Sequence, residues 1–410
     1  IAADMSISKK TIYKYFSNKE DLVSDSVTLI HGKIMAMMHD VIAKDYNPIR
    51  ENFEIRNMFK EMFKFSLNRE PPISKHAKIN VDEIVVTKWI EQRLNHFNIQ
   101  DERRWQMRYM ENRHYLQDGG PIFIYVGGEW DISKEWLQTG HMHDMASDLN
   151  GTMYYTEHRY YGYSRPSPSV NTSDLRWLTI DQALADLAHF IVQVKRTTPE
   201  IRNSGVFLVG ASYSASLVTY FMQKYPHLAN GAWSSSGPIE WVVDFSQYLE
   251  VVSDAFEELG GSECSSRIQR AYAELDKMIE EGQYNEIERL FRFCSPIDWS
   301  KKVEVMHFVN QLTLPFMISV QNYREEYQNV QNDCKRLLNN DQESDIEALS
   351  FWKNGVAPDN PTSQCFPYSY PDLIWFLTIT EWEFKASFDF YRQWTYQICF
   401  EVGVFQTTSS

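Results

Sequence analysis

The chain has 410 residues, 43% of them hydrophobic and 23% charged, so it can form two or three folded domains and is not mainly disordered. Its formal net charge of −15 argues against nucleic acid as the dominant partner, because phosphate binding needs a basic surface. The sequence holds no apolar run long enough to cross a membrane.

Residues 1–70 are predicted to be helical almost throughout. Ser8 suits the N-cap of a short helix, and Ser17 or Asn18 suits that of a longer helix opening at Lys19. A further helix is predicted over 55–67, before Pro71-Pro72 ends the series. This part is slightly basic, whereas the rest of the chain is strongly acidic, which indicates two parts selected for different surroundings.

From Gly119 onward the pattern changes to strands that alternate with helices. An amphipathic helix is predicted over 180–194, between the second and third of four short apolar runs. This order favours a mostly parallel α/β sheet. The predicted strands are 121–126, 152–156, 204–209 and 231–234.

Helical periodicity returns from about 245 to 394, interrupted by prolines. We interpret this stretch as a largely helical insertion. Breaks are expected at Pro296, Pro315, Pro358, Pro361, Pro367 and Pro371.

The most informative motif is Gly210-Ala-Ser212-Tyr-Ser214-Ala215, which follows a predicted strand and precedes a helical stretch over 217–224. A nucleophile elbow needs this context, because small neighbours let strand and helix approach around the serine. Ser214 stands where the usual pattern has glycine, which could add strain. A plain turn of small residues is the alternative interpretation.

A second backbone turn accompanies the elbow. Gly127-Gly128-Glu129 ends the first predicted strand, where a hydrolase of this type places one oxyanion N–H, here that of Gly128. The other N–H would come from Tyr213, directly after the serine. Glu157-His158-Arg159 also follows a strand, and we expect His158 to be structural. A tight turn and a polar loop are the alternative interpretations of the two segments.

The cysteines and sequons indicate an exported protein. None of the five cysteines is in a CxxC pair, so disulfides are favoured over a metal or redox site, and no metal or organic cofactor is implied. Asn150-Gly-Thr and Asn171-Thr-Ser are N-glycan acceptor sequences. The sequence has no signal peptide and does not begin with Met, from which a fragment is expected.

Six segments in conserved order carry a family resemblance over about residues 89–410. The chain resembles the serine carboxypeptidase-like family that includes lysosomal Pro-Xaa carboxypeptidase, dipeptidyl-peptidase II and thymus-specific serine protease. The segments are 92–98 (QRLNHFN), 119–128 (GGPIFIYVGG), 157–162 (EHRYYG), 178–186 (LTIDQALAD), the Ser212 elbow and 396–408 (YQICFEVGVFQTT).

The resemblance implies an α/β-hydrolase core with a helical cap inserted after the nucleophile strand. It implies an acyl-enzyme mechanism through Ser212 on proline-containing peptides, in a secreted or lysosomal setting, and relatives that often form homodimers. Whether the chain is a carboxypeptidase or a dipeptidyl-peptidase stays open. By family order the disulfides would be Cys264–Cys334 and Cys294–Cys365, which leaves Cys399 unpaired.

In this fold the acid and base of the triad follow the serine in the chain. The histidines after Ser212 are His227 and His307, and neither matches the family's base position. The family's Asp and His would lie beyond Ser410, so the α/β-hydrolase core is expected to be incomplete and the chain, as given, nearly inactive.

Residues 1–70 resemble part of a TetR-type helix-turn-helix, truncated at its start. The resemblance implies DNA contacts by Lys9, Lys10, Thr11, Tyr13, Tyr15 and Lys19, although loss of the dimerisation domain favours an inactive helical piece. A bacterial-type DNA-binding segment joined to an exported peptidase suggests a chimera.

The expected domains are a helical segment (1–74), the first part of the hydrolase core (75–244), the helical insertion (245–394) and a return to the core (395–410). Two alternatives to a peptidase remain: a DNA-binding transcriptional regulator fragment and a non-catalytic peptidase-like binding protein.

Overall fold

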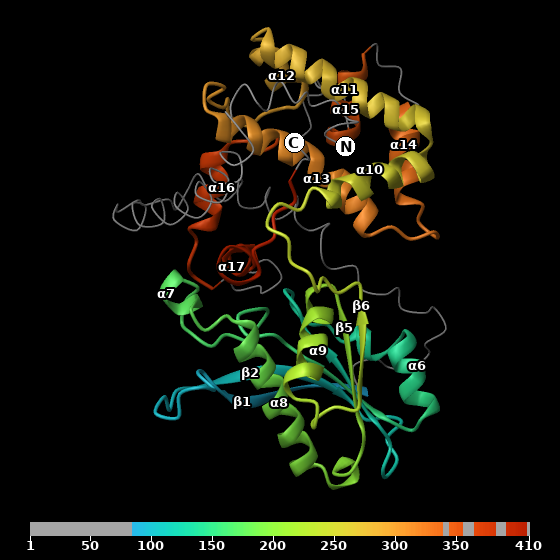
Figure 1. The fold of residues 1–410 in the computed structure, drawn as a ribbon, viewed down its shortest axis with the longest axis vertical. Helices are drawn as coiled ribbons and strands as arrows, with labels where there is room; N and C mark the ends of the chain where they lie inside the picture. The colour runs from blue at the N-terminus through green and yellow to red at the C-terminus, as the bar shows by residue number, and fades with distance from the viewer. Residues whose placement is uncertain (1–83, 339–343, 356–364, 383–390, 408–410) are drawn as a thin grey trace. The chain divides into compact units, whose positions relative to one another are not determined.

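The computed structural model describes residues 84–338, 344–355, 365–382 and 391–407 (Figure 1). Its contacts divide the chain into two compact units. In the described part, the sheet unit holds the residues up to Trp241 together with 379–403, and the helical unit holds Val242–Thr378 with the residues from Val404 onward. The predicted helices of residues 1–70, with Lys9, Lys10, Thr11, Tyr13, Tyr15 and Lys19, lie outside the described residues.

The sheet unit is built on six strands in the order β1-β2-β4-β3-β5-β6. The pairs β1–β2 and β2–β4 are antiparallel, and β4–β3, β3–β5 and β5–β6 are parallel. The strands are β1 (Val85–Arg93), β2 (Arg104–Asn112), β3 (Ile122–Val126), β4 (Thr152–Thr156), β5 (Val206–Ala211) and β6 (Gly231–Ser235).

Helices cover both faces of this sheet (Figure 1). Alternate residues of a strand point to opposite sides, so each strand contributes side chains to both helical layers. Ile122, Ile124 and Val126 pack with α8 (Ile180–Thr197) and α9 (Tyr213–Lys224). Phe123 and Tyr125 pack with the 3-10 helix η2 (Glu135–Leu137) and α6 (His141–Asp148). All five side chains of β3 are buried, as expected for a strand covered on both faces.

The four predicted strands and the helix over 180–194 are confirmed as β3, β4, β5, β6 and α8. The antiparallel strands β1 and β2 were not predicted. The return segment of the unit contains α17 (Tyr391–Gln397) and a turn of π-helix, η5 (Ile398–Val402).

The helical unit confirms the predicted helical character of the insertion. Its core is one cluster of apolar side chains drawn from all of its described helices but the last. The helices are α10 (Gln247–Gly260), α11 (Ser262–Glu280), α12 (Tyr284–Leu290), α13 (Lys302–Gln321), α14 (Asn329–Leu338), α15 (Asp345–Asn354) and α16 (Tyr370–Leu377).

One expected helix break is wrong. Pro315 lies inside α13, whereas Pro371 lies in the first turn of α16, where that helix begins. A proline in a helix leaves the carbonyl four residues earlier without its N–H partner. Here that carbonyl, of Gln311, accepts a hydrogen bond from Lys353 Nζ at 3.2 Å, so the helix continues. Pro371 needs no such partner, because first-turn N–H groups have no intrahelical acceptor.

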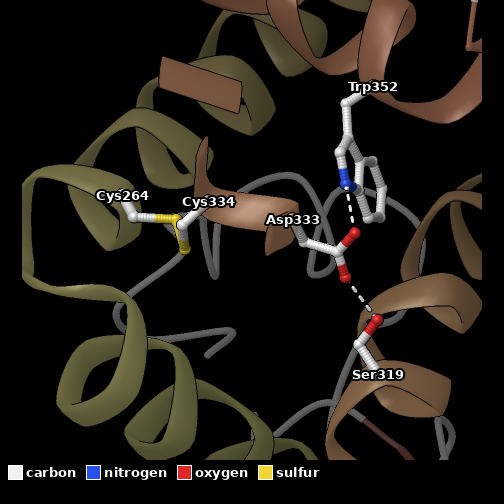
Figure 2. The surroundings of a disulfide bond; sticks show 5 residues. All are labelled: Cys264, Ser319, Asp333, Cys334 and Trp352. Atoms are coloured by element: carbon white, nitrogen blue, oxygen red, sulfur yellow. Dashed lines mark hydrogen bonds between the residues drawn. A yellow bond between two sulfur atoms is a disulfide. The ribbon is translucent and has the colours of Figure 1, made fainter. Parts of the chain in front are cut away.

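The disulfides pair as family order implied, Cys264 with Cys334 and Cys294 with Cys365, while Cys399 is free. Figure 2 shows that α14 is held at adjacent residues. Cys334 is bonded to Cys264 of α11, while Asp333 accepts hydrogen bonds from Ser319 of α13 and, at 3.0 Å, from Trp352 Nε1 of α15. Helix α14 is therefore fixed to three neighbours within one turn.

None of the helices in the described ranges is long and apolar enough to traverse a bilayer.

Candidate active site

Ser212 lies at the sharp junction between β5 and α9. It has φ 57° and ψ −131°, a backbone conformation that costs a non-glycine residue about 1–3 kcal/mol. Its N–H donates to Ser235 O of the neighbouring strand β6 at 3.0 Å, which holds the turn. The Ser212 residue is partly exposed.

The small residues of the motif are required by how closely helix and strand approach. A Cβ placed on Gly210 would lie 2.4 Å from Ser214 O, a backbone atom that a rotamer change does not move. Ser214 replaces the usual glycine without leaving a polar group unpaired. Its buried Oγ accepts from Ala211 N and donates to Ala211 O, both at 2.9 Å. The hydroxyl thus closes the elbow instead of straining it.

The glycine pair lies at the same edge of the sheet as Ser212. Strands β3 and β5 are parallel, with Tyr125 opposite Val209, so Gly128 and Ser212 each follow this pair by three residues. A Cβ on Gly127 would lie 2.4 Å from Thr156 O, and one on Gly128 would lie 2.7 Å from the Trp130 ring. The backbone therefore passes where a side chain does not fit.

Glu129, next in the chain, carries a buried carboxyl at this edge. Its residue is 4% exposed, and its Oε2 atom has no hydrogen-bond partner among the described residues. Burial raises the pKa of Glu129 to about 7, so its neutral form is favoured at acidic pH.

The Tyr213 side chain takes part in a buried hydrogen-bond network. Its hydroxyl lies 3.3 Å from His158 Nε2 and 2.8 Å from Gln397 Nε2. The other end of each partner is also bonded: His158 Nδ1 is 2.7 Å from Arg159 O, and Gln397 Oε1 is 2.6 Å from the Tyr161 hydroxyl. Burial lowers the pKa of His158 to about 4, so the ring stays neutral.

A second buried network explains three of the family segments. Arg159, fully buried, forms two parallel hydrogen bonds to Asp186 of α8, at 2.7 and 2.8 Å. His96 Nε2 adds a third contact to Asp186 at 2.7 Å. Burial alone would raise the pKa of Asp186, but Arg159 and His96 hold it below its usual value. The segments 92–98, 157–162 and 178–186 therefore meet in one structural ion cluster.

Glu157 anchors a further ion pair under the same loop. Its carboxylate accepts from Arg108 Nε at 3.1 Å and from Tyr163 N at 3.0 Å. Arg108 in turn also contacts Asp131. The polar residues after β4 thus serve the architecture of the site, which agrees with the structural role expected for His158.

The two later histidines occupy different places. His227 is exposed and follows the C-terminal end of α9, whereas Ser212 precedes its N-terminal end. The helix between them has 12 residues and is about 18 Å long. His307 is buried in α13 of the helical unit. Within the described residues, no hydrogen bond joins Ser212 Oγ to a histidine or a carboxylate.

The two sequons lie in different surroundings. Asn150 is exposed after α6 and has φ 53°. Asn171 caps the short helix α7 (Thr172–Leu175), and its Oδ1 accepts from Asp174 N at 2.8 Å.

A mostly parallel sheet covered by helices on both faces, with a serine on the turn from strand to helix, defines an α/β hydrolase of the serine type. The family model described as Serine carboxypeptidase S28 matches residues 92–410. The chain belongs to this family of serine peptidases.

Curated relatives agree with this assignment. The lysosomal Pro-X carboxypeptidase of Bos taurus is 34% identical over 226 residues, which cover 53% of this chain and 45% of that protein. The thymus-specific serine protease of Homo sapiens is 28% identical over 328 residues, or 78% of this chain and 63% of that protein. The chain spans about half the length of the first relative and less than two thirds of the second.

Among solved structures, brefeldin A esterase, a bacterial homologue of human hormone sensitive lipase, matches with TM-score 0.30 and 12% identity, covering 60% of this chain and 56% of that one. An acylaminoacyl peptidase of Pyrococcus horikoshii matches with TM-score 0.28 and 14% identity, covering 42% and 25%.

Proposed function

We propose that this protein is a serine exopeptidase that cleaves proline-containing peptides through an acyl-enzyme on Ser212. The elbow carries the proposal: a strained, partly exposed serine between a buried strand and a buried helix, in a chain of the S28 family. Strain at one residue persists only where the surrounding structure enforces it and is typical of functional sites.

The chemistry assigned to this site is nucleophilic acyl transfer. Ser212 Oγ attacks the scissile carbonyl as its proton passes to a base, the amine leaves with a proton, and water then releases the acyl group. The backbone N–H groups of Tyr213 and Gly128 would stabilise the oxyanion. The shared sheet edge of Gly128 and Ser212 supports this assignment.

We propose that the acid and base reach Ser212 from a segment outside the described residues. Strand β6 ends the described sheet, and Trp233 on it is 44% exposed. An open edge with exposed apolar side chains can accept a further strand. Such a strand would lie next to β6, whose Ser235 already holds the elbow.

The proposed setting is the lysosome or the extracellular space. Two disulfides suit an oxidising compartment, and the relatives include proteins named lysosomal Pro-X carboxypeptidase. Glycans on Asn150 and Asn171, and a homodimer, belong to the same proposal. Endoglycosidase shifts and light scattering test them.

The test is hydrolysis by the full-length protein at pH 5. Two peptide sets, one with penultimate C-terminal proline and one with proline second from the N-terminus, separate carboxypeptidase from dipeptidyl-peptidase action. Ser212→Ala should lose at least about 10³-fold in kcat, because the nucleophile is gone. Ser262→Ala, at an exposed serine in α11, should retain full activity.

Turnover that survives Ser212→Ala would contradict the proposed mechanism. Peptide binding without turnover in the wild-type full-length protein would contradict it too, and would favour a non-catalytic peptidase-like binding protein.

A further inference from the structure

The hydrogen-bond directions around Tyr213 follow from the acceptors at the ends of the network. Arg159 O is a carbonyl and only accepts, so His158 Nδ1 carries the proton and donates to it. In the neutral ring Nε2 is then the acceptor, and the Tyr213 hydroxyl donates to it. The Tyr213 oxygen therefore accepts from Gln397 Nε2, and Gln397 Oε1 accepts from the Tyr161 hydroxyl.

The network has one consistent arrangement and is closed to solvent. Tyr213 is 1% exposed, His158 5%, and Gln397 and Tyr161 are fully buried. The members come from three separate segments of the sheet unit: the loop after β4, the first residue of α9, and the end of α17. Trp394 packs on the Tyr213 ring, with centroids 5.4 Å apart.

The backbone of Tyr213 follows a strained residue. Ser212 holds a positive φ directly before it, and a backbone released from such strain relaxes toward ordinary values. The side chain of Tyr213 is one fixed point on the helix side, because its ring and its hydroxyl are both held. Holding this side chain restrains the first turn of α9, to which the Tyr213 N–H belongs.

We propose that His158 and Gln397 are positioning residues that hold Tyr213 by its hydroxyl, so that its backbone N–H stays aimed at the developing oxyanion. This inference rests on the proposed function, because it gives the Tyr213 N–H a role only in acyl transfer. Neither side chain touches the substrate. Their effect is on the transition state, where a displaced donor costs rate and leaves substrate affinity unchanged.

The test compares Tyr213→Phe with Tyr220→Phe in the full-length protein. Tyr220 lies on the same helix, and its hydroxyl accepts from Trp241 Nε1 at 2.8 Å, outside the network. Tyr213→Phe should lower kcat by about 10- to 100-fold, with KM within about twofold of wild type. Tyr220→Phe should change neither constant.

A transition-state analogue gives the readout that a purely structural role would not move. An alanyl-proline boronic acid forms a tetrahedral adduct with the serine, and its Ki should rise in Tyr213→Phe by the same factor as kcat falls. His158→Leu should behave like Tyr213→Phe. His158→Gln should recover most of the rate, because its amide can donate to Arg159 O or accept from Tyr213.

Each outcome has a distinct meaning. An unchanged Ki and kcat in Tyr213→Phe would overturn this inference while leaving the peptidase proposal standing. A kcat loss matched by an equal loss of folded protein in denaturation, with unchanged Ki per folded molecule, would also overturn it. Failure of the wild-type protein to hydrolyse any proline peptide would instead contradict the proposed function.

Discussion

Gly210 shows how a single residue type is imposed by backbone proximity. A Cβ at this position would overlap Ser214 O at 2.4 Å, and helix α9 would have to move away from β5. We predict that Gly210→Ala lowers the free energy of unfolding by about 1–3 kcal/mol and reduces activity as the elbow opens. Urea denaturation measures the first effect.

Gly231→Ala on β6 is the matched control, because its Cβ would make only ordinary contact with Phe207, at 3.4 Å. Equal destabilisation by the two substitutions would contradict the steric account of the elbow.

Substitutions at Asp186 and Asp181, both on α8, compare the stability contributed by a buried ion pair with that of a surface pair. Asp186 compensates the fully buried Arg159, whereas Asp181 pairs with Lys224 at the surface and has a side chain 62% exposed. Asp186→Asn should cost about 3–5 kcal/mol, because a buried guanidinium loses its counter-charge. Asp181→Asn should cost less than about 1 kcal/mol. Similar costs in chemical denaturation would show that the cluster does not stabilise the fold.

At the scale of elements, the four predicted strands are short apolar or small-residue runs, although β6 itself is largely exposed. Strands β3 and β4 are fully buried short apolar runs, which is the pattern that sequence reasoning detects. Strand β1 is an edge strand and carries Lys88, Glu91 and Arg93, so it lacks an apolar run. Strand β2 buries Arg108 and Glu111, whose partners are unknown from the sequence alone.

The same limit applies to the site. Ser212, Tyr213 and Gly128 could be predicted as site residues because the elbow and the glycine turn are local motifs. Gln397 escaped notice because its partner Tyr213 is 184 residues away, and a lone glutamine in a helix gives no signal. Its place within the family segment that begins at Tyr396 was the available indication.

Removing a disulfide tests the stability of the helical unit separately from that of the sheet unit. Each disulfide closes a loop of about 70 residues, which corresponds to about 4 kcal/mol in the chain-entropy model. We predict that the double change Cys264→Ser with Cys334→Ser lowers the free energy of unfolding of the helical unit by about 2–4 kcal/mol, which lowers its denaturation midpoint. Cys399→Ser, at the free thiol, should leave the midpoint unchanged.

Hydrogen exchange of the backbone amides around Trp352, which bonds to Asp333 beside Cys334, reports on this unit (Figure 2). An unaltered midpoint in the double variant would mean that the disulfide does not constrain the unit.

At the scale of the whole molecule, burial of Glu129 links stability to pH. Its pKa is raised from 4.5 to about 7 in the folded protein, so the folded state binds its proton more tightly than the unfolded chain. The resulting stability is complete below the unfolded pKa and is lost as pH rises through about 7. Glu129 should thus add on the order of 2–3 kcal/mol at pH 4.5 relative to pH 8.

Glu129→Gln should remove this part of the pH dependence, measured as the free energy of unfolding from pH 4.5 to 8. Glu102→Gln, at an exposed carboxyl, controls for the loss of one charge. A pH dependence that persists unchanged in Glu129→Gln would place its origin elsewhere.

The central claim is that Ser212 is an activated nucleophile, and covalent trapping tests it most directly. The full-length protein is treated with a fluorophosphonate at pH 5 to 7, digested and analysed by mass spectrometry. The account predicts one stoichiometric adduct on Ser212, lost on prior denaturation and absent from Ser212→Ala. An adduct on another serine, or none on Ser212 in the folded protein, would contradict it.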